Sequence, residues 1–134
     1  MEMEDKIHRY FDAWLKQEES GLENIFSEDA VYSECYGPEY HGRDQILRWF
    51  RDWNARGKVI AWDWKGWIRQ GNRAAVEWHF ACEYDGKPDA FDGVSMIEWN
   101  DSGRICALRE FQSKTEHVFP YGEMEDLVSR EDSI

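Results

Sequence analysis

The stretch AVYSECYGPEYHG, from Ala30 to Gly42, decides the fold, because it has the pattern of a short strand that ends in a turn and leads into a helix. Alternation along the strand places Tyr32, Glu34 and Tyr36 on one side. A carboxylate on an aromatic face must be solvated, paired or protonated. Glu34 is therefore either a residue at the rim of the fold or a functional one, and the sequence leaves both interpretations open.

Helices are predicted on both sides of this stretch, and strands after it. Apolar residues recur every three or four positions over 3–16 and 43–56, and Ser20 to Glu23 has the form of a capping box for a short helix that ends at Phe26. Alternating segments separated by turn-forming residues predict an antiparallel meander of strands at 58–69, 73–84, 89–99 and 104–116. We expect an α+β fold in which a cone-shaped, curved antiparallel sheet is closed by three N-terminal helices.

The composition restricts the partners and the compartment. The 134 residues fit a single domain over 1–134, with an acidic tail over 122–134 that either docks or frays. A net charge of -12 argues against binding a nucleic-acid backbone or an anionic membrane. Cys35, Cys82 and Cys106 fit neither a disulfide framework nor a zinc site, and the charged N-terminus has no apolar signal region. We therefore expect a soluble, cytoplasmic protein.

Alternation in the strands separates an inner from an outer face. In 73–84, one face carries Val76, Trp78, Phe80, Cys82 and Tyr84, and we expect this face to line the interior. The segment 104–116 has apolar residues on both faces, as expected if a second subunit covers the outer one. We therefore predict a homodimer through the outer sheet face, which carries these apolar residues: Val94, Met96, Ile105, Ala107 and Phe111.

The order and spacing of three short motifs along the chain are informative. The motifs are SEDAVYSECYG at 27–37, YHGRDQILRWF at 40–50, and Gly103-Arg104-Ile105 at the start of the last strand. In order and spacing they resemble the nuclear transport factor 2-like superfamily, in particular its SnoaL-like and ketosteroid isomerase-like domains. The likeness covers nearly the whole chain, and it implies a cystatin-like α+β barrel whose curved sheet wraps around a pocket.

The resemblance also implies roles for individual residues. It places the isomerases' general base at Glu34 and their phenolic donor at Tyr10. It aligns their second acid with Ser95, a weaker oxyanion donor, and this departure argues against steroid isomerisation itself. Glu110 is a second candidate base, or a partner that shares a proton with Glu34. The structural alternatives are a strand cap or an ion pair with Arg43 for Glu34, a helix-face aromatic for Tyr10 and a salt bridge for Glu110.

Aromatic side chains are numerous enough to form both a core and a ligand site. We expect the pocket to be lined by Trp14, Trp49, Trp53, Trp78, Phe80, Cys82, Leu108 and Gln112. The sequence has no nucleotide, zinc-protease or serine-hydrolase motif, and Glu77 with His79 lacks a third ligand, so no cofactor or metal is expected. These features predict an enzyme without a cofactor, an isomerase, cyclase, dehydratase or hydrolase, acting on an apolar or aromatic small molecule. The alternatives are a non-catalytic ligand-binding protein and a dimerisation module.

Overall fold

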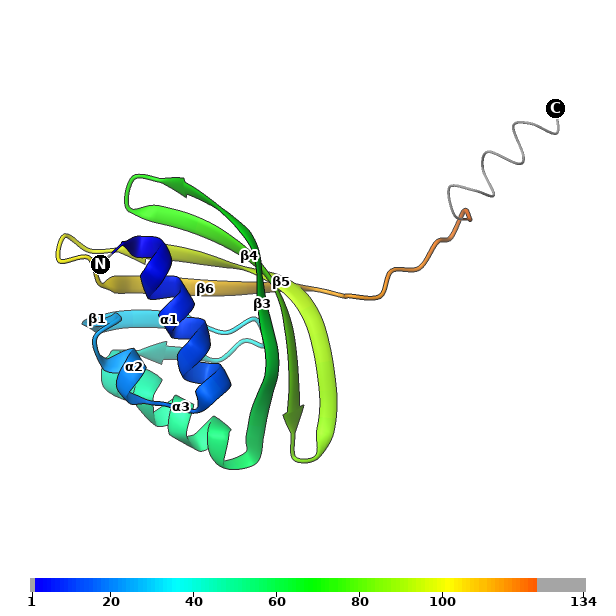
Figure 1. Cartoon of the computed structure of the whole chain (residues 1–134), viewed down its shortest axis with the longest axis horizontal. Helices are drawn as coiled ribbons and strands as arrows, with labels where there is room; N and C mark the ends of the chain where they lie inside the picture. Colours follow the sequence, from blue (N-terminus) through cyan, green and yellow to red (C-terminus); the bar gives the residue numbers. More distant parts are fainter. Residues whose placement is uncertain (1, 123–134) are drawn as a thin grey trace.

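The computed structural model of the chain describes residues 2–122. The elements are α1 (Met3–Lys16), α2 (Ser20–Glu23), β1 (Phe26–Ser33), β2 (Glu39–His41), α3 (Arg43–Arg56), β3 (Gly57–Gln70), β4 (Arg73–Tyr84), β5 (Lys87–Trp99) and β6 (Ile105–Ser113). The segment that follows β6 runs away from the sheet (Figure 1). From position 123 onward, the tail predicted over 122–134 lies outside the described residues.

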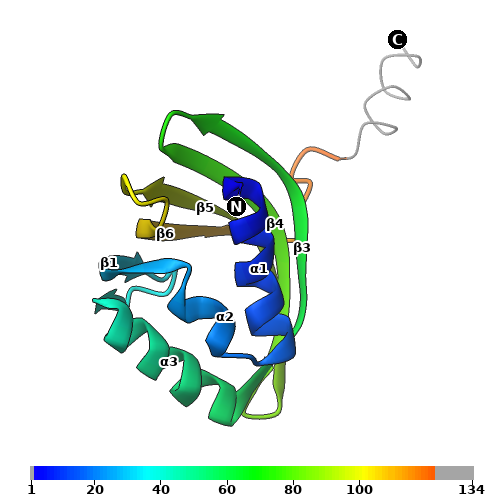
Figure 2. The same cartoon turned by 60° about the vertical axis from the view of Figure 1, so that its left-hand side comes forward.

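The strands form one six-stranded sheet in the order β2-β1-β6-β5-β4-β3. Strands β3 to β6 pair antiparallel in sequence order, which confirms the predicted meander. β1 pairs in parallel with β6 and antiparallel with β2, a strand that lies where the sequence predicted only a turn. Figures 1 and 2 show the sheet curling around the helices, with α1 and α3 on its concave side. The predicted α+β class, a curved sheet closed by N-terminal helices, is confirmed.

Helices α1 and α3 begin and end where the apolar period predicted. α1 buries Ile7, Tyr10, Phe11 and Trp14 on one face and packs against β3. This packing, rather than helix propensity, stabilises so short a helix. Among residues 2–122, no helix is both long and apolar enough to cross a lipid bilayer.

The short helix α2 differs from its prediction at both ends. Its N-cap position is Glu19 rather than Ser20, and Glu19 has helical dihedral angles and makes no side-chain capping bond, so the predicted capping box is wrong. The helix ends at Glu23 because the chain already joins the sheet at Phe26, which pairs with Ile105 of β6. β1 therefore starts earlier than the sequence predicted.

A bulge in β6 changes which residues face the core. Trp99 pairs with Ile105, and Glu98 pairs with Ala107, so Cys106 is an extra residue between two paired positions. Because of this extra residue, Ile105 is fully buried, although simple alternation placed it on the outer face. The prediction that Ile105 belongs to an exposed dimer surface is wrong. β6 also ends at residue 113, before the predicted end at 116.

α3 passes into β3 without a connecting loop. The helix ends at Arg56, and Gly57 is already extended. A Cβ atom at position 57 would lie 2.6 Å from the Tyr84 ring, so the close approach of β3 to β4 requires glycine here. The Arg56 guanidinium pairs with the Asp85 carboxylate at 2.5 Å, and the Arg56 carbonyl accepts a hydrogen bond from the Asp85 backbone N–H at 3.0 Å. The junction is thus tied to the turn that follows β4.

Candidate functional site

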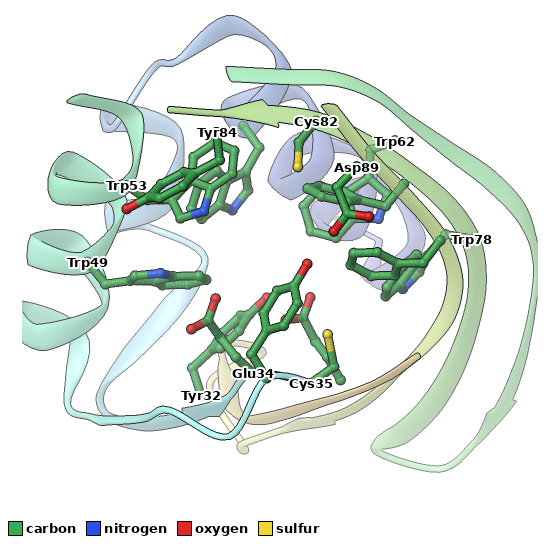
Figure 3. Close-up of a pocket in the computed structure, with 15 residues that line it drawn as sticks. Tyr32, Glu34, Cys35, Trp49, Trp53, Trp62, Trp78, Cys82, Tyr84 and Asp89 are labelled. Carbon is green, nitrogen blue, oxygen red and sulfur yellow. The ribbon is translucent and has the colours of Figure 1, made fainter. Parts of the chain in front are cut away.

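A cavity of about 340 Å³ lies between the concave face of the sheet and the helices. Most of its lining is aromatic, and the rest consists of carboxylates and cysteines. The lining residues are Trp14, Tyr32, Glu34, Cys35, Tyr36, Trp49, Trp53, Trp62, Trp78, Phe80, Cys82, Tyr84, Asp89, Phe91 and Glu110. Figure 3 shows Trp49 and Trp53 on one side, Trp62 and Trp78 on the other, and Tyr32 with Glu34 between them. The volume of the cavity is at the small end of the range for ligand pockets.

Strand register brings Glu110 into this cavity. In the paired strands β4, β5 and β6, Val76, Ser95 and Glu110 lie opposite one another and share a face. Val76 and Ser95 are buried on the inner side, and Glu110 is their neighbour at the cavity wall. The alternation that predicted Glu110 on the inner face of the sheet agrees with this register.

Glu110 belongs to a buried chain of hydroxyl groups. The Tyr10 hydroxyl of α1 donates a hydrogen bond to the Tyr32 hydroxyl of β1 at 2.5 Å. The pKa of Glu110 is raised to about 8, mainly by burial; hydrogen bonding to Tyr32 partly opposes this shift, and the nearby Glu34 carboxylate adds to it. Burial also raises the pKa values of Tyr10 and Tyr32 well above the ordinary value. Near neutral pH, Glu110 is therefore mainly a protonated acid.

Glu34 lies immediately after β1, in the turn that leads to β2. Its backbone N–H donates to the Pro38 carbonyl at 2.9 Å, and its carbonyl accepts from the Gly37 N–H at 3.1 Å. Its carboxylate accepts a hydrogen bond from the Tyr40 hydroxyl at 2.8 Å, and Tyr40 stacks on Trp49 with ring centroids 4.7 Å apart. Burial raises the pKa of Glu34, while the bond from Tyr40 lowers it. Glu34 is thus held in place at the cavity wall without an ion pair to Arg43 among the described residues.

The cavity combines acidic groups with aromatic walls and lacks basic groups. Among the described residues that line it, none is Lys, Arg or His, whereas three are carboxylic acids. The thiols of Cys35 and Cys82 also face the cavity, and burial raises their pKa values to about 12 and about 11, so both are neutral thiols rather than nucleophilic thiolates. Proton transfer by the carboxyl groups is the chemistry that this arrangement favours.

Within residues 2–122, no cluster of three or more His, Cys, Asp or Glu side chains has the geometry of a metal site. His79, considered with Glu77 in the sequence, instead forms a hydrogen bond with Asp92 at 2.8 Å. Asp92 is also close to Lys65 and Thr115. This cluster is therefore a polar network among neighbouring strands.

The family model of the SnoaL-like domain matches residues 7–108 of the chain. The protein belongs to this family. The match includes α1 from Ile7 onward with Tyr10, the turn with Glu34, helix α3 and the strands up to Leu108. The resemblance inferred from the sequence motifs is confirmed.

Solved structures similar to this SnoaL-like domain have the same fold. A hypothetical protein with a ketosteroid isomerase-like fold from Catenulispora acidiphila, in complex with trimethylamine, is 18% identical, with 82% of this chain and 85% of that chain covered and a TM-score of 0.72. An LEH-like epoxide hydrolase of M. tuberculosis is 16% identical, with coverages of 81% and 80% and a TM-score of 0.73. A protein of unknown function with a cystatin-like fold from Xanthomonas campestris is 17% identical, with coverages of 85% and 92% and a TM-score of 0.70.

Most of the residues predicted for the ligand site lie together at the cavity. Glu34 and Glu110 line it, as do the predicted aromatic and cysteine residues Trp14, Trp49, Trp53, Trp78, Phe80 and Cys82. Leu108 is completely buried in the core and does not line the cavity. Gln112 is exposed and also lies outside the lining.

The two predicted hydroxyl donors lie behind the cavity wall. Tyr10 is buried, and its hydroxyl contacts Tyr32, which does line the cavity. Ser95 is 1% exposed, and its Oγ accepts a hydrogen bond from the Trp78 indole N–H at 2.9 Å. Ser95 therefore orients a wall residue of the cavity, and the structure gives it no direct contact with the cavity space.

The sequence prediction omitted several lining residues. Tyr84 lies on the inner face that alternation identified in 73–84, whereas the strand with Phe91 has apolar residues on both faces, so its alternation did not single out an inner one. Trp62 was obscured because bulges at Ile60 and Lys65 interrupt the alternation of β3. Asp89 precedes Phe91 by two residues on β5 and lies opposite Cys82, so the same alternation extends to it.

Proposed function

We propose that this SnoaL-like domain is an enzyme without a cofactor that binds a small organic molecule in the cavity and acts on it by general acid–base catalysis. One observation carries the proposal: two glutamates with raised pKa values, Glu34 and Glu110, face the same mainly aromatic cavity. Catalytic acids and bases are commonly tuned in this way, by burial and by a neighbouring like charge.

The surroundings of the two carboxyl groups support different roles. Glu34 accepts a hydrogen bond from Tyr40, which favours its ionised form, so we assign it as the base that takes a proton from a carbon acid or from water. Glu110 has a pKa of about 8, so it is the acid that donates a proton to a substrate oxygen as negative charge develops there. The oxygen then returns its proton to Glu110 as the carbonyl group forms again, and the Glu34 proton goes to another carbon in an isomerisation or to the departing group in an elimination, so both carboxyl groups regain their starting states.

Tyr10 acts through Tyr32 in this proposal. The hydrogen bond from Tyr10 leaves the Tyr32 proton free to point toward Glu110 or toward a bound oxygen atom. Tyr32 is then the phenol that contacts the substrate, and Tyr10 is the residue that positions it. This modifies the role expected for Tyr10 from the isomerase resemblance.

The names of the similar structures are compatible with a small-molecule site. One neighbour is an LEH-like epoxide hydrolase, and another is in complex with trimethylamine. Both are less than 20% identical to this chain, so their chemistry supports the proposal only as a class of reaction or ligand.

The proposal is tested with small ketones in D₂O, for which proton abstraction appears in NMR spectra as loss of the signal of the proton next to the carbonyl. Small epoxides are assayed in parallel for diol formation, which requires an activated water. We expect turnover by the wild-type protein, a loss of about a hundredfold or more in Glu34→Gln, and a smaller loss in Glu110→Gln. Glu77→Gln is the matched control, because it removes a carboxylate from an exposed position of the same sheet.

Wild-type turnover in Glu34→Gln would show that Glu34 is not the base. If ligands bind but neither deuterium exchange nor diol formation exceeds the buffer rate, the protein is instead a non-catalytic binding protein. In that case both glutamine variants change affinity, and no product forms.

We also propose a homodimer through the outer face of the sheet. Strand register places Ile68, Ala75 and Met96 in one cross-strand row and Val94 with Phe111 in the next. Ile68 is 78% exposed and Phe111 is 51% exposed, which is unusual for large apolar side chains on neighbouring rows. Light scattering at micromolar concentration should give twice the chain mass, and Phe111→Glu should give the monomer mass. A wild-type monomer would refute the dimer.

A further inference from the structure

The acidic groups of the cavity have no basic partner among the described residues. Glu34, Asp89 and Glu110 line the cavity, and none of the three forms an ion pair there. Buried carboxylates are normally paired with a cation or a metal, because an isolated charge is strongly disfavoured in an apolar environment. Asp89 is exposed at the rim, but Glu34 and Glu110 are held among aromatic rings.

The walls of the cavity are suited to a cation. Ten of its fifteen lining residues are Trp, Tyr or Phe. The π face of an aromatic ring attracts a cation, most strongly in the case of Trp, and a cage of several rings is a known way to bind ammonium groups. Figure 3 shows Trp49, Trp53 and Tyr84 on one side of the open space and Trp62 and Trp78 across it. An ammonium group in this space would contact rings on two sides and carboxyl groups on a third.

We propose that the cavity selects a small organic cation, a protonated or quaternary amine, whose charge supplies the counter-ion that Glu34 and Glu110 lack. This rests on the proposed function only in taking the cavity as a small-molecule site. It narrows the predicted ligand from any apolar or aromatic molecule to an amine with apolar substituents. The apolar substituents fill the aromatic walls, and the charge lies toward the two glutamates.

Binding of a cation should be linked to proton release from Glu110. The titratable groups near it are Tyr32 with Tyr10 behind it, Glu34 with the adjacent Cys35, and Tyr40; none of them is a Lys, Arg or His. With a pKa of about 8, Glu110 is ionised in roughly one molecule in ten at about pH 7 and in roughly nine in ten at about pH 9. If the cation binds only the ionised form, its affinity rises about tenfold over this interval.

The test compares choline with 3,3-dimethylbutan-1-ol, which has the same shape and a neutral carbon in place of the ammonium nitrogen. Binding of each to the full chain is followed by calorimetry and by tryptophan fluorescence at about pH 7 and about pH 9. We expect choline to bind at least tenfold more tightly than the alcohol at the higher pH. The affinity of choline should increase about tenfold with pH, whereas that of the alcohol should not increase. Calorimetry in two buffers of different ionisation enthalpy should detect the released proton.

Two variants separate a specific carboxylate from the general negative charge of the protein. Glu110→Gln should abolish the pH dependence and weaken choline binding at the higher pH by about tenfold. Glu77→Gln changes the net charge by the same amount at an exposed position of β4, and it should bind choline as the wild type does. Equal effects of the two substitutions would overturn the proposal.

The outcomes distinguish this inference from the proposed function. If the alcohol binds as tightly as choline, selection of a cation is refuted and the small-molecule site stands. If neither probe binds at millimolar concentration but deuterium exchange or diol formation is observed, the cation proposal again fails alone. Absence of binding and of turnover would refute both.

Discussion

Replacing Glu110 by Gln should change how the stability of the protein depends on pH. In the folded protein, burial and the nearby Glu34 raise the pKa of Glu110 to about 8 from an ordinary value of 4.5. The folded state therefore holds a proton that the unfolded chain has released between these two values. Stability contributed by the protonated form is fully present below about pH 4.5 and is lost as the pH rises through about 8. Gln resembles the protonated acid in size and polarity but cannot ionise.

The size of the effect follows from the two pKa values. Each pKa unit corresponds to about 1.4 kcal/mol, so the wild type loses about 3 kcal/mol by about pH 7 and at most about 5 kcal/mol above pH 8. Solvation of the carboxylate through the open cavity reduces the upper figure. Because small domains have a free energy of unfolding of about 5 to 15 kcal/mol, even the smaller loss is readily measured.

The assay is urea unfolding of wild type and Glu110→Gln at intervals from about pH 5 to about pH 9, followed by tryptophan fluorescence and circular dichroism. The two proteins should agree within about 1 kcal/mol at the acidic end, and the variant should be more stable by about 3 kcal/mol or more at the alkaline end. Other titrating groups are common to both proteins, and Glu77→Gln serves as the control with a parallel curve. A difference that does not vary with pH would show that Glu110 is already ionised at neutral pH, and the assignment of Glu110 as the acid would be refuted.

Three further substitutions test the packing and hydrogen bonding around the cavity. Ser95→Ala leaves the buried Trp78 N–H without its acceptor, so the free energy of unfolding should fall by about 1 to 3 kcal/mol; an unchanged value would show that a water replaces the hydroxyl. Gly93→Ala places a Cβ atom 2.5 Å from a backbone carbonyl of β6 and closer still to the Trp78 ring, so it should destabilise by about 1 to 3 kcal/mol or prevent folding, and a normal melting temperature would contradict the tight contact. Tyr32→Phe removes a hydrogen bond that lowers the pKa of Glu110, so that pKa should increase further in a carboxyl ¹³C NMR titration; a decrease would mean that the hydroxyl stabilises the neutral acid.

Local sequence patterns predicted the elements whose structure depends on local interactions. The helical period identified α1 and α3, and the turn residues identified the connections between β3 and β6. The start of β1 at Phe26 and the existence of β2 depend on pairing with distant or newly formed strands, which no local pattern reveals. The burial of Ile105 depends on a bulge in β6, and a single extra residue is enough to reverse a prediction based on alternation.

The candidate site could be predicted only in part for the same reason. Alternation and family resemblance identified which side chains face inward, including Glu34 and Glu110. They could not reveal that Tyr10 reaches the site through Tyr32, because this contact joins residues 22 positions apart on different elements. The acidic character of the cavity likewise depends on which side chains meet in space. Asp89 joins the site because the pairing of β4 with β5 places it opposite Cys82.

The direct passage from α3 into β3 determines how a ligand reaches the cavity. The ion pair and the backbone hydrogen bond between Arg56 and Asp85 join the end of α3 to the β4–β5 turn. Helix α3, which carries Trp53, therefore cannot move outward without also displacing the β4–β5 hairpin. The opposite side is the five-residue turn between β1 and β2, where Tyr36 is 55% exposed and its ring rests edge-on against Phe91 at 5.7 Å. Such turns move on the nanosecond to microsecond timescale. Ligand exchange is therefore expected to follow the opening of this turn, whereas the fixed corner keeps the aromatic wall in place for the next molecule.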